Sequence, residues 1–247
     1  MQKRVVEENH PSHVLSRAVE GRPIFKNKED AYRFLFQVYT TNYGSPPLNL
    51  HRRDVQRAVE QLLAGKEISE MLYKKQHEPL VHILSFTEVV NHYHFLLLPN
   101  QENGISLYMK KLNTAFAKYF NLKYSRKGTL FESRYKSIPI KTEPQLDAII
   151  RYINVKNPLD VYQPRWREEG LRHKKEGWNF LFEYPFSSFP DIVGQRNSMF
   201  LAPEPVRSQF LGRAAIYGEN GYEEFLKEPL HSAGTRFPEI LLEEQHV

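Results

Sequence analysis

The chain of 247 residues contains no cysteine. A disulfide framework and a zinc site built on cysteine thiolates are therefore excluded, and a reducing compartment is the natural one. Long apolar runs are also missing, because the longest, residues 95–98, falls far short of the roughly 18 residues that span a membrane. The N-terminal residues lack the apolar core of a signal peptide. We therefore expect a cytoplasmic protein with no membrane partner.

Common signatures of nucleotide-dependent and hydrolytic enzymes are missing as well. The sequence has no glycine-rich phosphate loop and no Gly-X-Ser-X-Gly elbow, and the spacing of its carboxylates singles out no paired acidic site. It contains no internal repeat and no low-complexity segment. With a hydrophobic fraction of 40%, the chain is long enough for one sizeable core with an appended tail.

Acidic residues are nearly absent from one segment. The chain carries 34 lysines and arginines against 29 aspartates and glutamates, but between Ser106 and Lys141 the only acid is Glu132. The cations of this segment are Lys110, Lys111, Lys118, Lys123, Arg126, Lys127, Arg134, Lys136 and Lys141. Tyrosines and phenylalanines are interspersed among them, which favours a nucleic-acid-binding surface. A solvated helix face is the alternative interpretation.

Hydrophobic periodicity predicts an alternation of strands and helices. Strands are expected at residues 13–19, 80–86, 89–98 and 130–138, with the middle two joined by a turn at Thr87-Glu88. Helices are expected at residues 28–39, 54–63 and 106–119, and from an N-cap at Thr142, with Gln145 as its capping-box partner, to a stop at Asn157-Pro158. This order predicts an α+β fold in which helices cover one face of an antiparallel sheet and leave the other face open for function.

The expected strand at residues 89–98 carries two histidines, in the sequence Asn91-His92-Tyr93-His94. Side chains alternate along a strand, so His92 and His94 should point to the same face, where both can reach one divalent cation. The alternative is one core histidine and one chance histidine. A His-X-His pair within an apolar strand favours metal binding.

The helix that begins at Thr142 carries Tyr152 at the edge of its apolar face. A phenol can attack a phosphodiester when a metal polarises the phosphate, and the product is a covalent phosphotyrosine. Without the histidine pair, a boundary tyrosine with a packed ring and a wet hydroxyl would be the simpler interpretation. The pair is therefore what favours a catalytic role for Tyr152.

Three further residues have both a functional and a structural interpretation. Lys156, one turn after Tyr152, could hold a phosphate or only complement the helix end. Asn157 could offer an amide oxygen as a third metal ligand or only cap the helix. Arg134, within the strand expected at residues 130–138, suits a bidentate phosphate contact or a buried ion pair.

Together these segments resemble the REP-associated tyrosine transposases, a branch of the single-tyrosine HUH, or IS200-like, transposases. The HUH motif, two histidines around one hydrophobic residue, matches His92-Tyr93-His94. The other motifs follow in the family's order: a basic helix with Lys110 and Lys111, a Gly-X-Leu-Phe-X-X-Arg-Tyr-Lys-Ser segment at residues 128–137, a helix end with Tyr152, and a Ser-Ser-Phe element at residues 187–189. The family usually has asparagine or glutamine four residues after the tyrosine, where this chain has Lys156 and then Asn157.

The resemblance implies a ferredoxin-like palm, which we place in a catalytic domain of residues 1–194 with a helical insertion at about residues 44–79, followed by a mostly helical extension at residues 195–247. It implies Mg²⁺ or Mn²⁺ held by His92 and His94, with Asn157 as the candidate third ligand, and Tyr152 as a nucleophile that forms a 5′-phosphotyrosine. Single-stranded or hairpin DNA is the expected partner of this nucleoid-associated monomer or homodimer. The expected DNA contacts are Lys110, Lys111, Arg134, Lys136 and Lys156.

Two other functions stay open. A domesticated relative could grip DNA or RNA hairpins without cutting them, which Lys156 at the usual amide position favours. An unrelated ferredoxin-like RNA-binding protein would carry the histidine pair by accident and would stack bases on aromatic side chains of its sheet.

Overall fold

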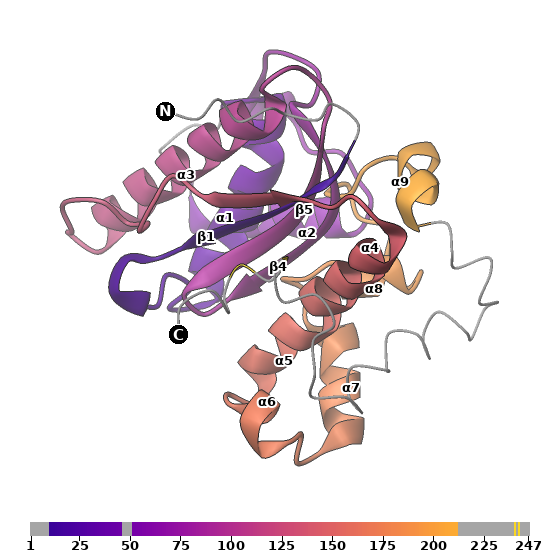
Figure 1. Cartoon of the computed structure of the whole chain (residues 1–247). Coiled ribbons are helices and arrows are strands. Elements are labelled where there is room, and N and C mark those ends of the chain that lie inside the picture. The colour runs from indigo at the N-terminus through magenta and orange to yellow at the C-terminus, as the bar shows by residue number, and fades with distance from the viewer. Residues whose placement is uncertain (1–9, 46–50, 212–239, 241, 243–247) are drawn as a thin grey trace.

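A computed structural model of the chain describes residues 10–45, 51–211, 240 and 242. At its centre is a four-stranded antiparallel sheet in the strand order β4-β5-β1-β6, with helices packed on both faces (Figure 1). The strands are β1 (Ser12–Arg17), β4 (Val81–Val89), β5 (His92–Pro99) and β6 (Lys136–Pro139). The α+β class with an antiparallel sheet, predicted from the sequence, is confirmed.

The first face of the sheet packs against α1 (Lys28–Tyr43) and α3 (Gly104–Lys123), and α2 (Arg52–Leu63) packs against α1. The main core lies here and is rich in aromatic rings, among them Phe34, Phe95 and Phe116. The order β1-α1-β4-β5-α3-β6 is that of a ferredoxin-like β-α-β-β-α-β fold. The segment that contains α2 is inserted between α1 and β4, within the range expected for a helical insertion.

A buried carboxylate joins α1 to the end of α3. Asp30 is fully buried, and its oxygens accept hydrogen bonds from the hydroxyls of Tyr119 (2.9 Å) and Tyr124 (2.7 Å) and from Nζ of Lys123 (2.6 Å). Burial lowers the pKa of Lys123, but its hydrogen bonds to Asp30 and Tyr119 outweigh burial and raise the pKa above its ordinary value. Lys123 therefore stays charged, and each oxygen of the buried carboxylate accepts hydrogen bonds.

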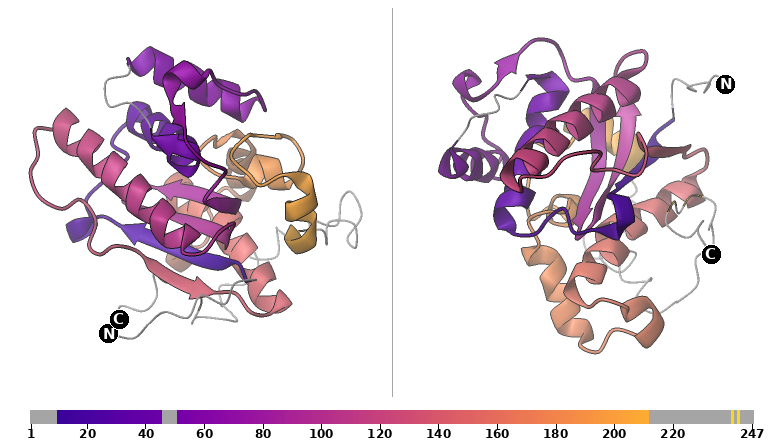
Figure 2. Two further views of the ribbon diagram at one scale, coloured as in Figure 1. Left: turned by 90° about the horizontal axis from the view of Figure 1, so that it is seen from above. Right: turned by 90° about the vertical axis from the view of Figure 1, so that its left-hand side faces the viewer.

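The second face, which the sequence predicted to be open, is covered by a further layer of helices. α4 (Glu143–Arg151), the π-helical turn η3 (Tyr152–Lys156) and α5 (Asn157–Tyr162) lie against this face. Figure 2 shows them on the side of the sheet opposite α1 and α3. The prediction that helices cover only one face needs this correction, because Leu84 and Leu96 point to the second face and are buried there against Ile149 and Ile153.

The helix that carries Tyr152 begins as predicted but does not end as predicted. Thr142 and Gln145 form the expected capping box. The expected stop at Asn157-Pro158 is wrong, since the chain stays helical through Pro158 into α5. Proline has no N–H and its ring crowds the carbonyl four residues earlier. The π-helical turn widens the helix just before Pro158 and accommodates the ring.

Strand β6 begins at Lys136 and is shorter than predicted. Just before it, the side chain of Asn113 binds a backbone carbonyl that would otherwise pair with β1. Nδ2 of Asn113 donates to the carbonyl oxygen of Arg134 (2.8 Å) and to Oγ of Ser16 (3.1 Å). Residues 130–135 therefore approach β1 without joining the ladder, apart from one bridge between Phe131 and Ala18. Arg134, expected within a strand, lies in an exposed loop.

The remaining described elements are short. They are η1 (Val19–Gly21), β2 (Gly44–Ser45), η2 (Glu70–Leu72), β3 (Lys74–Lys75), α6 (Trp166–Glu169), α7 (Lys174–Glu183), α8 (Phe189–Ile192) and α9 (Glu204–Leu211). The turn between β4 and β5 falls at Val90-Asn91 rather than at Thr87-Glu88, because β4 extends to Val89. The helical pattern predicted beyond Leu211 lies outside the described residues. Across the described part of the chain, no helix combines the length and the apolar character needed to cross a membrane.

Replacing Asp30 should destabilise the fold strongly. Asp30→Ala leaves the ammonium of Lys123 and two tyrosine hydroxyls without their buried acceptor, and we expect the free energy of unfolding to fall by about 3 kcal/mol. Urea unfolding followed by circular dichroism measures the change. Glu29→Ala removes the neighbouring exposed carboxylate and should cost at most about 1 kcal/mol. Equal losses for the two variants would contradict the prediction.

Candidate nuclease site

The histidine pair lies on the second face of the sheet. The register of β5 with β1 sets three opposite pairs: His92 with Arg17, His94 with Leu15, and Leu96 with His13. Opposite residues of an antiparallel pair share a face, and Leu96 belongs to the core beneath α4 and η3. His92 and His94 point the same way, as the strand alternation predicted, and their ring centroids are 5.0 Å apart.

A chain of hydrogen bonds extends from the carbonyl of Ile240 through His13 to His94. Nδ1 of His13 is 2.7 Å from the oxygen of Ile240, and Nε2 of His13 is 2.8 Å from Nδ1 of His94. A carbonyl oxygen only accepts, so Nδ1 of His13 donates to Ile240. A neutral His13 then accepts at Nε2 from the Nδ1–H of His94. This arrangement directs the lone pair of His94 to Nε2.

His92 also carries its proton on Nδ1, and this follows from its contact with the neighbouring Asn91. Nδ1 of His92 is 2.6 Å from Oδ1 of Asn91, while the amide nitrogen of Asn91 donates to the carbonyl of Gly21 (3.0 Å). Because the amide oxygen only accepts, Nδ1 of His92 donates, and its lone pair is on Nε2. Each histidine of the pair therefore has one N–H held by an acceptor, which is the usual arrangement of metal-binding histidines.

Tyr152 lies beside the histidine pair. Its ring centroid is 5.5 Å from that of His94, in an edge-on contact, and 6.1 Å from that of His13. The guanidinium of Arg167 lies 5.0 Å from the centroid of the same ring. His92, His94 and Tyr152 are only 6%, 0% and 1% exposed, respectively. A phosphodiester can therefore reach Tyr152 only after the residues around it move apart.

A buried polar network holds the Tyr152 helix against the sheet. Nδ2 of Asn154 donates to Oγ of Ser85 on β4 (2.8 Å), and Oδ1 of Asn154 accepts from Oγ of Ser188 (2.6 Å). Oγ of Ser188 also accepts from the backbone N–H of Phe86 (2.9 Å). A fully bonded network in a core fixes one relative position of the segments that it joins. The Ser-Ser-Phe element at residues 187–189 thus clamps the tyrosine helix to a strand next to β5.

The π-helical turn changes which residue follows Tyr152 on the same side of the helix. In a regular α-helix the residue four positions later lies one turn above, but in η3 the N–H of Asn157 bonds to the carbonyl of Tyr152, five positions earlier. Asn157 therefore takes the place that Lys156 would have in a regular helix. The π-helical turn thus brings Asn157, rather than Lys156, one turn above Tyr152.

The donors at this face suit a divalent cation. His92 and His94 direct two imidazole lone pairs, and the fully buried Asn157 adds an amide. Its Oδ1 accepts from Arg167 (2.7 Å), and its Nδ2 has no hydrogen-bond partner among the residues that the structure describes. Among the described residues, no three histidine, cysteine or acidic side chains group closely enough to hold a metal. Oxygen atoms of water and substrate would therefore complete the coordination of a hard cation.

The predicted DNA contacts divide between the two faces of the sheet. Lys136 of β6 is opposite Leu15, in the same row as His94, and Lys156 lies in η3. Lys110 and Lys111 belong to α3, on the other face, where burial lowers the pKa of Lys111. The structure thus brings Lys136 and Lys156 to the histidine face, and it does not bring Lys110 and Lys111 there.

Two side chains near Tyr152 were not singled out from the sequence. His13 is 81 residues from its partner His94, so only the pairing of β1 with β5 reveals their contact. The alternation of β1 shows that His13 shares a face with Arg17, but not which strand lies alongside. Arg167 stands in a strongly charged segment whose composition suggested solvent exposure, whereas it donates to Asp160 (2.6 Å) and to Asn157.

Comparisons with known proteins concern the same part of the chain. Residues 52–156 match the model of the family described as "Transposase IS200 like". A solved structure described as a REP-associated tyrosine transposase bound to a REP hairpin is similar at 12% identity and a TM-score of 0.42, over 83% of this chain and 92% of that one. No curated protein matches the chain. The matched segment 52–156 includes both histidines and Tyr152, and the match agrees with the resemblance found in the sequence.

Proposed function

We propose that this chain nicks single-stranded DNA at a hairpin and becomes joined to it through Tyr152. The observation that carries the proposal is the contact between the rings of Tyr152 and His94, 5.5 Å between centroids, within the segment that matches the IS200-like transposases. Two imidazoles with directed lone pairs and a phenol at one face suit metal-assisted attack on a phosphodiester.

His92 and His94 would hold Mg²⁺ or Mn²⁺, with the amide of Asn157 as the third protein ligand. When bound, such a cation would polarise the scissile phosphate and offset its negative charge. Arg167 helps to position both Tyr152 and Asn157, because its guanidinium lies over the ring of Tyr152 and donates to the amide oxygen of Asn157.

The reaction exchanges one phosphodiester for another. The oxygen of Tyr152 forms a bond to phosphorus, the bond from phosphorus to the 3′ oxygen breaks, and this oxygen takes up a proton to replace the one that the phenol loses to solvent. The products are a 5′-phosphotyrosine and a free 3′-hydroxyl. Because the phosphotyrosine is still a diester, a second 3′-hydroxyl can attack it and release Tyr152. The same site thereby both cuts a strand and joins a new one.

Positive side chains around the site supply the attraction for DNA. Lys136 and Lys156 lie at the histidine face and are suited to the phosphates next to the scissile one. Lys110, Lys111 and Arg134 are proposed contacts farther along the bound DNA. Since the catalytic side chains are buried, part of the binding energy must be used to open the site.

A hairpin-binding protein that does not cut is the second candidate. The near-complete burial of His94 and Tyr152 favours it. Such a protein would bind a hairpin with the same affinity whether or not His92 and Tyr152 are present, and it would form no covalent product. The experiment that follows separates the two candidates.

Substituting the nucleophile should abolish the covalent product without abolishing binding. With a labelled single-stranded hairpin and Mn²⁺, the wild-type protein should give a denaturation-resistant adduct, and Tyr152→Phe should give none, because no other oxygen replaces the phenol. Gel electrophoresis under denaturing conditions measures the adduct. Tyr162→Phe, the same change in α5 where the ring packs on Phe180, is the matched control and should retain the adduct. An adduct on Tyr152→Phe would refute the assignment.

Metal affinity should depend on all three histidines of this face, but in different degrees. His92→Ala and His94→Ala each remove a ligand and should abolish measurable Mn²⁺ binding by titration calorimetry. His13→Ala removes only the acceptor that orients His94, so we expect an affinity about 10 to 100 times weaker. His82→Ala, a change in β4 at the other end of the sheet, is the control and should bind as the wild type does. Unchanged affinity in His94→Ala would overturn the proposed metal site.

A further inference from the structure

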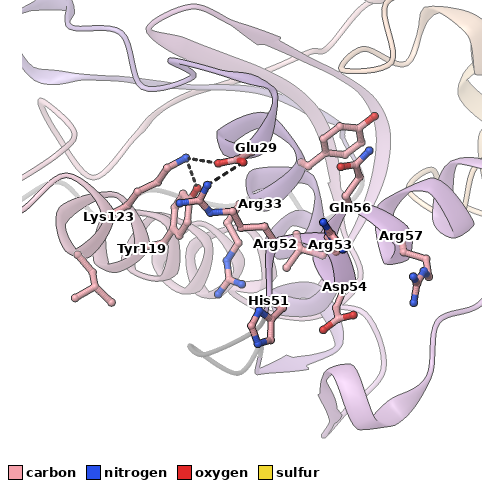
Figure 3. A pocket seen from close by; sticks show the side chains of 13 residues that line it. Glu29, Arg33, His51, Arg52, Arg53, Asp54, Gln56, Arg57, Tyr119 and Lys123 are labelled. Carbon is pink, nitrogen blue, oxygen red and sulfur yellow. Dashed lines mark hydrogen bonds and ion pairs between the residues drawn. The ribbon is translucent and has the colours of Figure 1, made fainter.

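A basic hollow lies between α1, α2 and the C-terminal part of α3, on the side of the sheet opposite Tyr152. Its volume is about 980 Å³, and its cationic lining is formed by Arg33, Arg52, Arg53, Arg57 and Lys123, with His51 at the edge (Figure 3). The acidic side chains of the lining are Glu29 and Asp54. We call this hollow the α2 groove. Nothing in the proposed cutting reaction uses it.

The acidic side chains of the α2 groove do not cancel its charge. Glu29 is already bonded to Arg52 (3.0 Å) and to Lys123 (3.3 Å). Five cationic side chains therefore face two lining carboxylates and the buried Asp30, which pairs with Lys123, so the cations still outnumber the carboxylates. The hollow has a net positive charge that a polyanion would neutralise.

Arg52, Arg53 and Arg57 are exposed charges of the α2 groove. Arg52 is paired with Glu29, whereas Arg53 and Arg57 point to solvent without such a pair in the described part of the chain. Arg53 and Arg57 are four residues apart on α2, so they lie on one side of the helix and about 6 Å apart along its axis. Two guanidinium groups at this spacing suit two successive phosphates of one strand, since arginine binds phosphate in a bidentate manner.

A buried guanidinium and an aromatic ring form the floor of the groove. Arg33 is only 4% exposed, and its guanidinium lies 5.4 Å from the ring centroid of Tyr119. Burial lowers the pKa of Arg33, which means that its charge is held at a cost in solvation. Tyr32 also lines the groove and, with Tyr119, offers ring surface for a base.

A second basic hollow lies next to the α2 groove. This second hollow, of about 350 Å³, is lined by Arg22, Lys26 and Arg126 and by the ring of Tyr124. The two hollows share a wall, because Lys123 of the first and Tyr124 of the second both bond to Asp30. Lys26 lies 4.2 Å from the centroid of the Tyr124 ring.

The far end of the second hollow adjoins the turn before β5. Gly21, next to Arg22, accepts from the amide of Asn91, and the oxygen of that amide accepts from His92. The hydrogen bonds of Asn91 therefore link the residue next to Arg22 with His92, at the edge of the candidate metal site.

We propose that the α2 groove binds the sugar-phosphate backbone of the DNA strand that continues beyond the nicked phosphate. The inference rests on the proposed function, because it assigns the path of the same bound strand. Arg53 and Arg57 hold two phosphates, Arg33 adds charge from the floor, and the tyrosine rings accept a base. The groove thus increases affinity without reading sequence.

Salt-dependent binding tests this assignment. A DNA hairpin with single-stranded flanks is titrated with wild-type protein and with Arg53→Ala/Arg57→Ala, in about 50 to 200 mM salt, by fluorescence anisotropy. Two lost phosphate contacts should weaken binding about tenfold or more at the lowest salt and reduce the slope of log affinity against log salt by roughly 1.5 to 2. Both arginines are exposed, so circular dichroism and thermal unfolding should be unchanged.

A matched charge change checks that the effect is local. Lys174→Ala/Lys175→Ala removes two exposed charges from α7, on the other side of the molecule, and should leave the slope within about 0.5 of wild type. An unchanged slope in the arginine variant, or an equal loss in both double variants, would overturn the proposal. So would competition by polyglutamate as effective as competition by DNA, since the groove would then suit an acidic protein.

Failure of this inference can be told from failure of the proposed function. If the arginine variant keeps the wild-type slope while the Tyr152 adduct still forms, the groove assignment is wrong and the nuclease assignment stands. If no adduct forms in any variant but the slope falls as expected, the groove binds DNA in a protein that does not cut.

Discussion

The place of Tyr152 beside the histidines depends on the buried amide of Asn154. This one side chain bonds to Ser85 of β4 and to Ser188 of the segment before α8, so that a helix, a strand and a turn are fixed together. An amide left unpaired in a core costs about 1 to 3 kcal/mol, which makes other positions of the helix unfavourable. Apolar packing alone would tolerate small shifts along the sheet. The hydrogen bonds of Asn154 are directional and do not tolerate such shifts. This matters because a phenol must be placed to within a fraction of an ångström to act as a nucleophile.

The chemistry of the candidate site is set by residues that would not themselves touch a substrate. His13 and Asn91 decide which nitrogen of each paired histidine carries its proton, and Arg167 joins the tyrosine to Asn157. These contacts come from separate parts of the chain. The pairing of β1 with β5 and the packing of helices on the second face of the sheet bring them together. The opposite face has a different character. Its cations surround a hollow without catalytic side chains, which fits holding a strand rather than cutting it.

Local patterns predicted much of this structure, and long-range contacts account for what they missed. Strand alternation was enough to orient His92 and His94, and side-chain chemistry was enough to predict the capping box at Thr142. No local pattern could place His13 next to His94, because strand order depends on the packing of the whole sheet. The second helical layer was missed for a similar reason. A helix such as α4 shows one apolar stripe whichever face of the sheet it covers, so periodicity does not tell which face that is.

The widened turn at residues 152–156 shows how a helix can absorb one additional residue. A regular α-helix would rotate everything after an insertion by about 100° around its axis. Here the extra residue is confined to a single turn, so Asn157 stays aligned with Tyr152 and α5 keeps its side toward β4. Two helices can therefore place the same pair of side chains in the same relation although the number of residues between the two side chains differs. A relative without the additional residue can hold the same two groups in the same relation with a shorter spacing.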